Sequence, residues 1–350
     1  MRLRFLGLAV GGAVLLAFPA TGMADTIDVF PGHSIQHAVN HAHRGDTIKV
    51  HDGVYHQSVA IRRNGLTLSG AGADLKTGTV IKPGHAKRCQ GGGSGFCILS
   101  HKAGNKRVRT KNTTVKGFLV RNFDDTGLIA VGAKRTTIIR NRFAKDGEYG
   151  AAAFSSIRTK FVRNLSTGNH EAGFYVGDSP HAKALLRHNK ARGNGSFGFF
   201  LRDSAHGRAL NNTAVHNCLG IGVLNTGAPG TARRWLVKGN TVRKNNKFCK
   251  AQEGGPPISG TGIGLVGAKQ TVVRQNSVRG NKPRQSAPFA GGIVTISSKP
   301  LGGSDPASDT VAHNFAFSNQ PADLRWDGSG TDIRFRGNHC GTSQPNGLCS

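Results

Sequence analysis

The chain has 350 residues, of which 47 are Lys or Arg and 18 are Asp or Glu, so its formal net charge is +29. Hydrophobic residues make up 37% of the chain, which is enough for a sizeable core and excludes wholesale disorder despite the high charge. A charge of this sign and size favours acidic partners.

The first 24 residues form a predicted signal peptide. Arg2 and Arg4 precede an apolar run at residues 5–18, and the small residues Gly22 and Ala24 precede an expected cleavage site. The apolar run is too short to cross a bilayer, and no later segment approaches about 20 consecutive apolar residues. We therefore predict a secreted, extracellular protein without a membrane span.

Residues 25–46 are predicted to form an N-terminal cap. Ser34 is a suitable N-cap for an amphipathic helix that extends to residue 43. Short strands are predicted after this helix, at residues 45–50, 53–55, 59–61 and 66–70.

An internal repeat dominates the chain from residue 138 onward, with a unit of about 23 residues. In each copy an apolar residue lies three positions before a leading Asn. The leading residues are Asn141, Asn164, Asn189, Asn212, Asn240, Asn276, Asn314 and Asn338. A second Asn often follows five positions later, at Asn169, Asn194, Asn217, Asn245, Asn281 and Asn319, whereas the first copy has Asp146 there.

One copy of this repeat cannot bury an apolar face alone, but stacked copies can. No helix-length apolar periodicity accompanies it, so the repeat predicts a coil of parallel strands in one elongated domain. An Asn at a fixed turn can bond the backbone of the next winding. We therefore predict that both Asn columns are structural.

The capping helix, the short strands and the repeat together resemble the secreted right-handed parallel β-helix proteins of the pectin and pectate lyase-like superfamily. This resemblance implies an all-β fold, a single-stranded right-handed parallel β-helix over residues 25–350. Residues 320–350 are expected to form its C-terminal cap. The resemblance does not define an activity, because the superfamily contains lyases, hydrolases, epimerases and proteins without known catalysis.

Six cysteines occur as three near pairs in the part of the chain that follows the predicted signal peptide. An even number of cysteines in an exported chain favours disulfides. A metal site is the alternative, but no Cys-x-x-Cys spacing occurs. Grouping by proximity predicts three pairs, Cys89 with Cys97, Cys218 with Cys249, and Cys340 with Cys349.

A column of basic residues is predicted six positions before the leading Asn of five consecutive copies. Its members are Arg135, Arg158, Lys183, His206 and Arg234. Successive windings lie about 4.8 Å apart, so these side chains should form a continuous strip that binds an extended polyanion. The alternative is a solvated surface that keeps the protein soluble.

A column of acidic residues is predicted at Asp125, Glu148 and Glu171, which are spaced by 23 residues. Stacked carboxylates repel one another, and a bound Ca²⁺, an interleaved Arg or a raised pKa would relieve the repulsion. Resemblance to β-helix lyases implies calcium at these acids. Exposed carboxylates neutralised by nearby arginines are the alternative.

Asp178 and Asp203 begin two similar segments that end at His181 and His206. The first segment resembles the Asp-Pro-His element of alginate C-5 epimerases, with an extra Ser. Its recurrence 25 residues later favours a turn over a catalytic motif.

Four insertions interrupt the repeat and are expected to project from it, building the wall of a binding site. They lie at residues 82–111, 247–260, 279–292 and 301–309.

These patterns predict a monomeric protein that binds an acidic polysaccharide and cleaves it by lyase or hydrolase chemistry. The candidate catalytic residues are Glu148, Glu171 and Lys183, and calcium is the one cofactor considered. The alternative is a non-catalytic protein that binds polyanions or cell walls. Nucleic acid ranks below polysaccharide, because the chain has 3 Tyr, 2 Trp and 18 Phe, and many Phe are expected to face inward.

Overall fold

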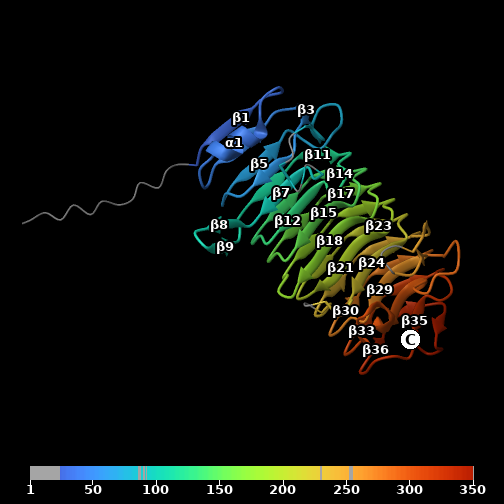
Figure 1. Cartoon of the computed structure of the whole chain (residues 1–350). Coiled ribbons are helices and arrows are strands. Elements are labelled where there is room, and N and C mark those ends of the chain that lie inside the picture. Colours follow the sequence, from blue (N-terminus) through green and yellow to red (C-terminus); the bar gives the residue numbers. More distant parts are fainter. Residues whose placement is uncertain are drawn as a thin grey trace, which may run out of the picture.

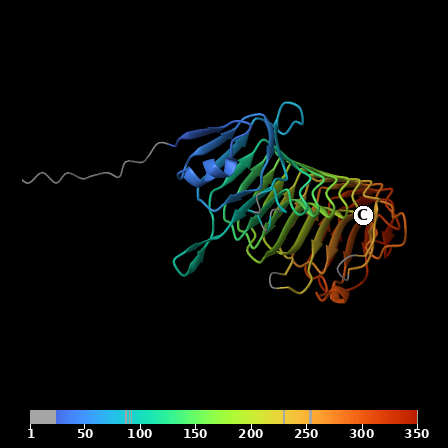
Figure 2. The ribbon, with the colours of Figure 1, turned by 45° about the horizontal axis from the view of Figure 1, so that its top comes forward.

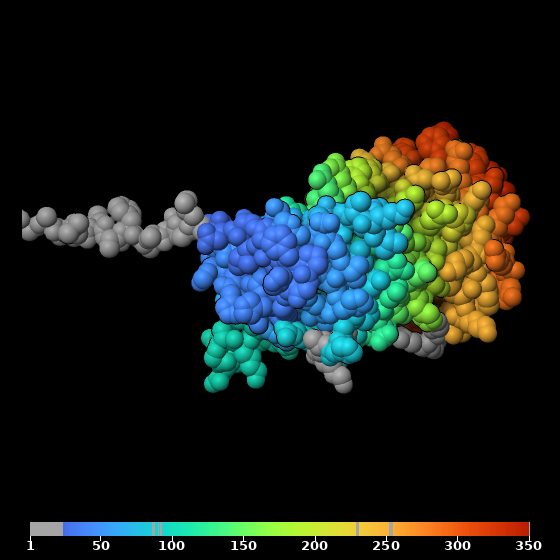
Figure 3. All heavy atoms as spheres, turned by 90° about the horizontal axis from the view of Figure 1, so that it is seen from above, coloured from blue at the N-terminus to red at the C-terminus, as the bar shows by residue number. Residues whose placement is uncertain are grey.

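The computed structural model describes residues 24–85, 88–89, 91, 93–228, 231–251 and 255–349. Apart from Ala24, the predicted signal peptide lies outside the described residues. The described chain winds into an elongated coil, and most windings contribute one strand to each of three parallel sheets (Figure 1). The space-filling view shows the windings in sequence order from one end to the other (Figure 3).

Sheet A has twelve strands in the described part of the chain. In order along the coil they are β1 (Thr26–Val29), β2 (Thr47–Val50), β5 (Thr67–Gly70), β10 (Thr114–Lys116), β13 (Thr137–Ile139), β16 (Lys160–Val162), β19 (Leu185–Arg187), β22 (Arg208–Leu210), β25 (Leu236–Lys238), β30 (Val272–Arg274), β33 (Thr310–Ala312) and β36 (Arg334–Arg336).

Sheet B has eleven strands within the described residues. They are β3 (Gly53–His56), β6 (Thr79–Lys82), β11 (Phe118–Arg121), β14 (Arg142–Ala144), β17 (Leu165–Thr167), β20 (Lys190–Arg192), β23 (Thr213–Val215), β26 (Thr241–Arg243), β31 (Ser277–Arg279), β34 (Phe315–Phe317) and β37 (His339–Cys340).

Sheet C also has eleven strands among the residues described. They are β4 (Val59–Ile61), β7 (Phe96–Leu99), β12 (Leu128–Val131), β15 (Tyr149–Phe154), β18 (Ala172–Ser179), β21 (Phe197–Ser204), β24 (Leu219–Leu224), β29 (Thr261–Val266), β32 (Gly291–Ile296), β35 (Leu324–Trp326) and β38 (Ser343–Gln344).

Two antiparallel hairpins and two short helices complete the secondary structure of the described residues. Strands β8 (His101–Ala103) and β9 (Lys106–Val108) form a hairpin that projects from the body (Figure 2). Strands β27 (Phe248–Cys249) and β28 (Ile258–Ser259) form the second hairpin. The helices are α1 (Ile35–His41) and the 3₁₀ helix η2 (Lys299–Leu301). None of the described helices is long and apolar enough to span a membrane.

The core is built from one inward-facing residue of each short strand. In sheet A this residue is the apolar one that precedes the leading Asn by three positions. Ile138, Phe161 and Leu186 occupy this place on successive strands, paired in register and fully buried. The repeat therefore marks the inward face of each winding, and the predicted all-β solenoid is confirmed.

Both Asn columns form buried ladders between windings. Asn212 is typical: its Oδ1 accepts hydrogen bonds from the backbone amide and side chain of Asn189, at 2.9 and 3.1 Å. Its Nδ2 donates to the carbonyl of Leu186 at 2.9 Å and to Oδ1 of Asn240 at 3.0 Å. Each Asn thus satisfies buried polar groups of the neighbouring windings, as the sequence predicts.

Two carboxylates replace amides or hydroxyls in such buried columns. Asp146 precedes Asn169 in the second ladder, and its Oδ1 accepts a hydrogen bond from the amide of Phe123 at 3.1 Å. Asp309 accepts one from the amide of Thr271 at 2.7 Å. The other oxygen of each carboxylate is buried without a hydrogen-bond partner. Burial raises the pKa of Asp146 well above its ordinary value and raises the pKa of Asp309 to about 8.

Replacing Asp309 with Asn is expected to raise the free energy of unfolding by about 1–3 kcal/mol at pH 8. Below the ordinary pKa of 3.8 the Asp is protonated in both states, so the variant gains little there. As the pH rises toward about 8, the unfolded chain releases its proton first and the wild type loses stability. Urea denaturation at pH 4 and pH 8 measures this difference, and an equal effect at both pH values would contradict the assignment. Asp146→Asn is expected to act in the same direction.

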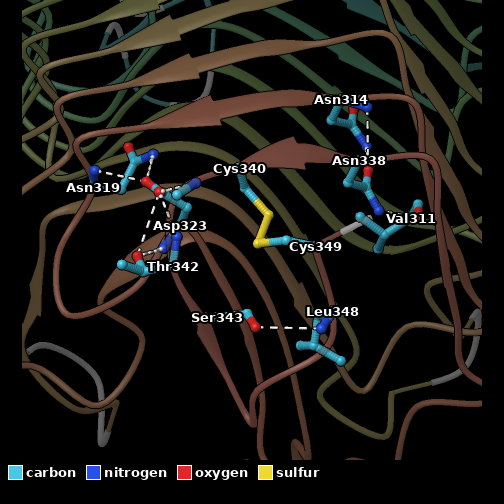
Figure 4. Close-up of a disulfide and its surroundings, with 11 residues drawn as sticks. Val311, Asn314, Asn319, Asp323, Asn338, Cys340, Thr342, Ser343, Leu348 and Cys349 are labelled. Carbon is cyan, nitrogen blue, oxygen red and sulfur yellow. Dashed lines mark hydrogen bonds between the residues drawn. A yellow bond between two sulfur atoms is a disulfide. The ribbon is translucent and has the colours of Figure 1, made fainter.

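Each end of the coil is closed. The N-cap Ser34 accepts a hydrogen bond from the amide of His37, and α1 covers the first windings (Figure 1). At the other end, Oδ1 of Asp323 accepts hydrogen bonds from Asn319 and terminates the second ladder (Figure 4). Its Oδ2 accepts from the amides of Gly341 and Thr342, which ties the last winding to the ladder.

Three disulfides are present, with the pairing that the sequence predicts. Cys89 is bonded to Cys97, Cys218 to Cys249, and Cys340 to Cys349. The second disulfide links the residue before β24 to strand β27, so it holds the β27–β28 hairpin against sheet C. The third closes the C-terminal winding (Figure 4).

Candidate functional site

The outer face of sheet C carries an aromatic cluster that lies outside the main core. Ala152, Tyr175 and Phe200 are paired on successive strands and point to the same side as Tyr149. The ring of Tyr175 lies 4.6 Å from that of Tyr149 and 5.3 Å from that of Phe200, and Phe197 stacks on Phe200 at 3.9 Å. Phe197 and Phe200 are therefore exceptions to the predicted inward orientation of many Phe residues.

A cleft of about 420 Å³ lies over the C-terminal half of this cluster. Its floor includes Phe197 and Phe200. Three of the four insertions contribute to its walls, through Pro256, Phe289 and Leu301. The prediction that insertions build a wall is therefore correct for residues 247–260, 279–292 and 301–309. The insertion at 82–111 instead carries β7 and the β8–β9 hairpin.

Charged side chains also line the cleft, namely Glu171, Arg202 and Lys250. Nε of Arg202 lies 3.3 Å from a carboxylate oxygen of Asp203. The Asp203 carboxylate is fully buried and accepts hydrogen bonds from the amide and hydroxyl of Thr226. Because Asp203 is held in this way, its carboxylate holds the guanidinium of Arg202 in place at the cleft. The side chain of Arg202 is one-third exposed.

The buried tyrosines beside the cleft hold their protons strongly. Burial, followed by the negative charge of Asp178, raises the pKa of Tyr175, and the positive charge of Arg202 acts in the opposite direction. Burial also raises the pKa of Tyr149, with further contributions from Glu171 and Glu148. Both hydroxyls therefore stay protonated to higher pH than an exposed tyrosine would.

The acidic column is in register, but its carboxylates meet different partners. The amide of Glu148 donates to the carbonyl of Asp125, and the amide of Glu171 donates to that of Glu148. The side chain of Asp125 packs closely against Gly93, Glu148 forms a hydrogen bond with Tyr149, and Glu171 lines the cleft.

Calcium at these acids is a prediction from the sequence. Among the described residues, no group of three or more His, Cys, Asp or Glu side chains is placed to hold a metal ion. The calcium site at Asp125, Glu148 and Glu171 has no support from the placement of the described side chains and stays a prediction from the sequence.

The basic strip is continuous, and it lies at the turn between sheets C and A. The amide of each member donates to the residue just before the next member, for example from Arg135 to Ile157 and from Arg158 to Ala182. The five members, Arg135, Arg158, Lys183, His206 and Arg234, all have positive φ. The pKa of His206 is lowered, first by partial burial and then by the positive charges of Arg234, Arg233 and Lys183. The lowered pKa reflects the positive potential along the strip.

The structure does not bring Lys183 together with the two candidate catalytic acids. Glu171 precedes β18, whereas Lys183 follows it. The eight residues of this strand span roughly 26 Å. Arg135 and Arg158 instead line a groove toward sheet A with Lys160. The acids and the strip thus lie at opposite edges of sheet C.

Asp178 and Asp203 both adopt the left-handed conformation, with φ of 49° and 45°, at the ends of β18 and β21. This geometry agrees with the predicted role of both segments as turns. The buried carboxylate of Asp203 has the additional effect of positioning Arg202.

Sequence reasoning missed four residues that line the cleft: Phe197, Phe200, Arg202 and Lys250. Strand alternation could have placed Phe200 and Arg202 on the face opposite Phe199 and Leu201, which are buried in the core. No comparable signal could have located Lys250, because its position depends on how the insertion folds back over the sheet.

The comparisons with known proteins agree with this architecture. A family model described as "Right handed beta helix region" matches residues 53–214 and 126–302. These matches cover more than half of the chain, so the chain belongs to this family, and the predicted superfamily resemblance is confirmed. A search of curated proteins found no match.

Several solved structures are similar to the chain at low sequence identity. The mannuronan C-5 epimerase AlgE6 A-module of Azotobacter vinelandii is 16% identical, with a TM-score of 0.57 and coverage of 89% of each chain. The AlgE4 A-module of the same organism is 15% identical, with a TM-score of 0.55, covering 88% of this chain and 92% of the module. DFA-IIIase from Arthrobacter chlorophenolicus A6, without its lid, is 13% identical, with a TM-score of 0.54 and coverages of 91% and 98%. At these identities the similarity shows the fold alone.

Proposed function

We propose that the protein is secreted and that it binds an acidic polysaccharide in the cleft over sheet C, where it acts on the polymer as an enzyme. The observation that carries this proposal is that a single cleft combines the stacked rings of Phe197 and Phe200 with two cations and one carboxylate. The cations are Arg202 and Lys250, and the carboxylate is that of Glu171. The mannuronan epimerases with the same fold are enzymes named for a polysaccharide substrate, which supports this class of substrate.

Each group in the cleft suits one part of an acidic sugar. Phe197 and Phe200 are 8% and 5% exposed, and the part of them that lines the cleft gives it an apolar surface for the C–H groups of a sugar. Arg202 can bind a carboxylate through two parallel hydrogen bonds, and Lys250 adds a second positive charge. Glu171 is the cleft carboxylate and the candidate for proton transfer to or from the sugar.

The basic strip provides a second reason to propose an acidic polymer. Five cationic or titratable residues follow one another along one edge of sheet C, one winding apart. Together with the net charge of +29, this arrangement attracts polyanions and raises their concentration at the surface. Arg135, Arg158, Lys183, His206 and Arg234 are therefore proposed as polymer contacts outside the cleft.

Replacing Glu171 with Gln is expected to abolish product formation, a loss of at least about 100-fold, with polymer binding retained. The protein is incubated with polygalacturonate, alginate or a glycosaminoglycan, with and without calcium. Unsaturated products are followed by absorbance and new reducing ends by a colour reaction. Glu148→Gln is the matched control, because Glu148 lies one winding away and does not line the cleft.

Salt-sensitive binding without product on any of these polymers would contradict cleavage of the polymer by lyase or hydrolase chemistry. Equal loss of activity in both variants would show that the acidic column acts as a unit and that the cleft alone does not define the reaction.

A further inference from the structure

The outer face of sheet B presents two columns of side chains that the proposed function does not use. Strand pairing places the members of each column one above the other. The first column is Lys190, Thr213, Thr241, Ser277 and Phe315. The second column is Arg192, Val215, Arg243, Arg279 and Phe317.

This face is strongly positive. Lys190, Arg192, His216 and Arg243 line a shallow groove of about 540 Å³, whose floor includes Thr213 and Val215. None of the described strands of sheet B contains Asp or Glu. The cations of this face are therefore not neutralised by acids of their own sheet, and they create a positive field over the groove.

Two phenylalanines stand at the C-terminal end of the same face. Phe315 is 48% exposed and Phe317 is 36% exposed, and both belong to β34. Phe315 stacks on His339 with ring centroids 4.9 Å apart, and the guanidinium of Arg279 lies 5.8 Å from the ring centre of Phe317. The rings are thus held in place beside the column of arginines while remaining open to solvent.

We propose that the outer face of sheet B is a second binding surface for acidic polysaccharide, separate from the cleft, with the polymer running along the axis of the coil. The polymer class rests on the proposed function. Arg243 and Arg279 are one winding apart, about 4.8 Å, which is close to the length of one sugar residue in an extended chain. Successive carboxylates can therefore meet successive arginines, while the Phe rings contact sugar C–H faces.

The arrangement of rings favours polysaccharide over single-stranded nucleic acid. Proteins that bind single strands stack successive bases on aromatic rings placed along a basic groove. Here the groove between Lys190 and Arg243 is lined by Thr and Val, and the two exposed rings lie beyond it at one end. Bases bound over the groove would have no ring on which to stack.

Two surfaces on one rigid coil would change how the protein holds a polymer. A chain bound on sheet B keeps other segments of the same polymer at high local concentration near the cleft on sheet C. A tetrasaccharide is too short to use both surfaces. The second surface should therefore contribute to the binding of long chains and leave the binding of a tetrasaccharide in the cleft unchanged.

The test uses the triple variant Arg192→Gln, Arg243→Gln, Arg279→Gln. Isothermal titration at one ionic strength is expected to show an affinity for polygalacturonate about tenfold lower than that of the wild type. Affinity for tetragalacturonate in the cleft is expected to remain within about twofold. The matched control removes the same charge from exposed positions on sheet A, by Arg187→Gln, Arg208→Gln, Arg274→Gln. A second variant, Phe315→Ala with Phe317→Ala, is expected to weaken polygalacturonate binding without any change of charge.

The possible outcomes separate this surface from the cleft. An equal loss of polymer affinity in the sheet A control would overturn the proposal, because diffuse charge would then explain the binding. If the Phe variant weakens binding of an oligothymidylate more than binding of polygalacturonate, the proposal is overturned in favour of a nucleic-acid ligand. If only cleft variants such as Phe200→Ala weaken binding, the second surface is wrong and the proposed function stands. If only the sheet B variants weaken binding, the cleft is wrong and the second surface stands.

Discussion

Replacing Asn212 with Ala is expected to lower the free energy of unfolding by about 3–5 kcal/mol. The side chain of Asn212 is buried and joins three consecutive windings through hydrogen bonds to Asn189, Leu186 and Asn240. Alanine removes all of these bonds at once. The amide of Asn189 and the carbonyl of Leu186 then stay buried without partners, and each unsatisfied group costs about 1–3 kcal/mol.

The neighbouring Asn211 provides the matched control for this prediction. It is exposed and has a φ of 52°, a conformation that Gly adopts without strain. Asn211→Gly is therefore expected to change stability by less than about 1 kcal/mol. Denaturant unfolding followed by circular dichroism compares the two variants. Similar stabilities for Asn212→Ala and the wild type would show that the ladder does not hold the windings together.

The double variant Phe200→Ala, Arg202→Gln is expected to weaken binding of an acidic tetrasaccharide by about 100-fold. The ring of Phe200 forms part of the cleft floor, and Asp203 holds the guanidinium of Arg202 beside it. The variant removes both the apolar surface for the sugar ring and the positioned cation for its carboxylate. Titration calorimetry with tetragalacturonate measures the loss.

Phe154→Ala is the corresponding control on the same sheet. Phe154 belongs to the same aromatic cluster and packs on Tyr175 at 4.6 Å, but it does not line the cleft. Its replacement should lower stability modestly and leave tetragalacturonate affinity within about threefold. A loss in Phe154→Ala as large as that in the double variant would indicate that binding depends on the packing of the whole cluster.

Most of the fold could be predicted from the repeat. The leading Asn and the apolar residue before it recur because every winding must satisfy the same buried polar groups and fill the same core position. Ile138, Phe161 and Leu186 therefore revealed the inward face, and the spacing of the cysteines predicted the observed disulfide pairs. The spacing of the repeat also predicted that the residues of the basic strip lie one above another on successive windings.

The candidate site was less accessible to sequence reasoning, for two physical reasons. Register places Asp125, Glu148 and Glu171 in one column, but the direction of each side chain depends on neighbours such as Gly93 and Tyr149. The cleft also depends on insertions that fold back over the outer face of sheet C, and these segments lie outside the repeat. The sequence therefore indicated Glu171 as a candidate site residue, but Phe200 and Arg202, which line the same cleft, were missed.

A crystal structure of the protein with a bound acidic oligosaccharide tests the proposed site most directly. We expect a sugar ring packed against Phe200 and a sugar carboxylate within hydrogen-bonding distance of the Arg202 guanidinium. Glu171 should then face a C–H or glycosidic oxygen of the same ligand. Oligosaccharide bound only along the strip or on sheet B, with solvent alone over Phe197 and Phe200, would contradict this account.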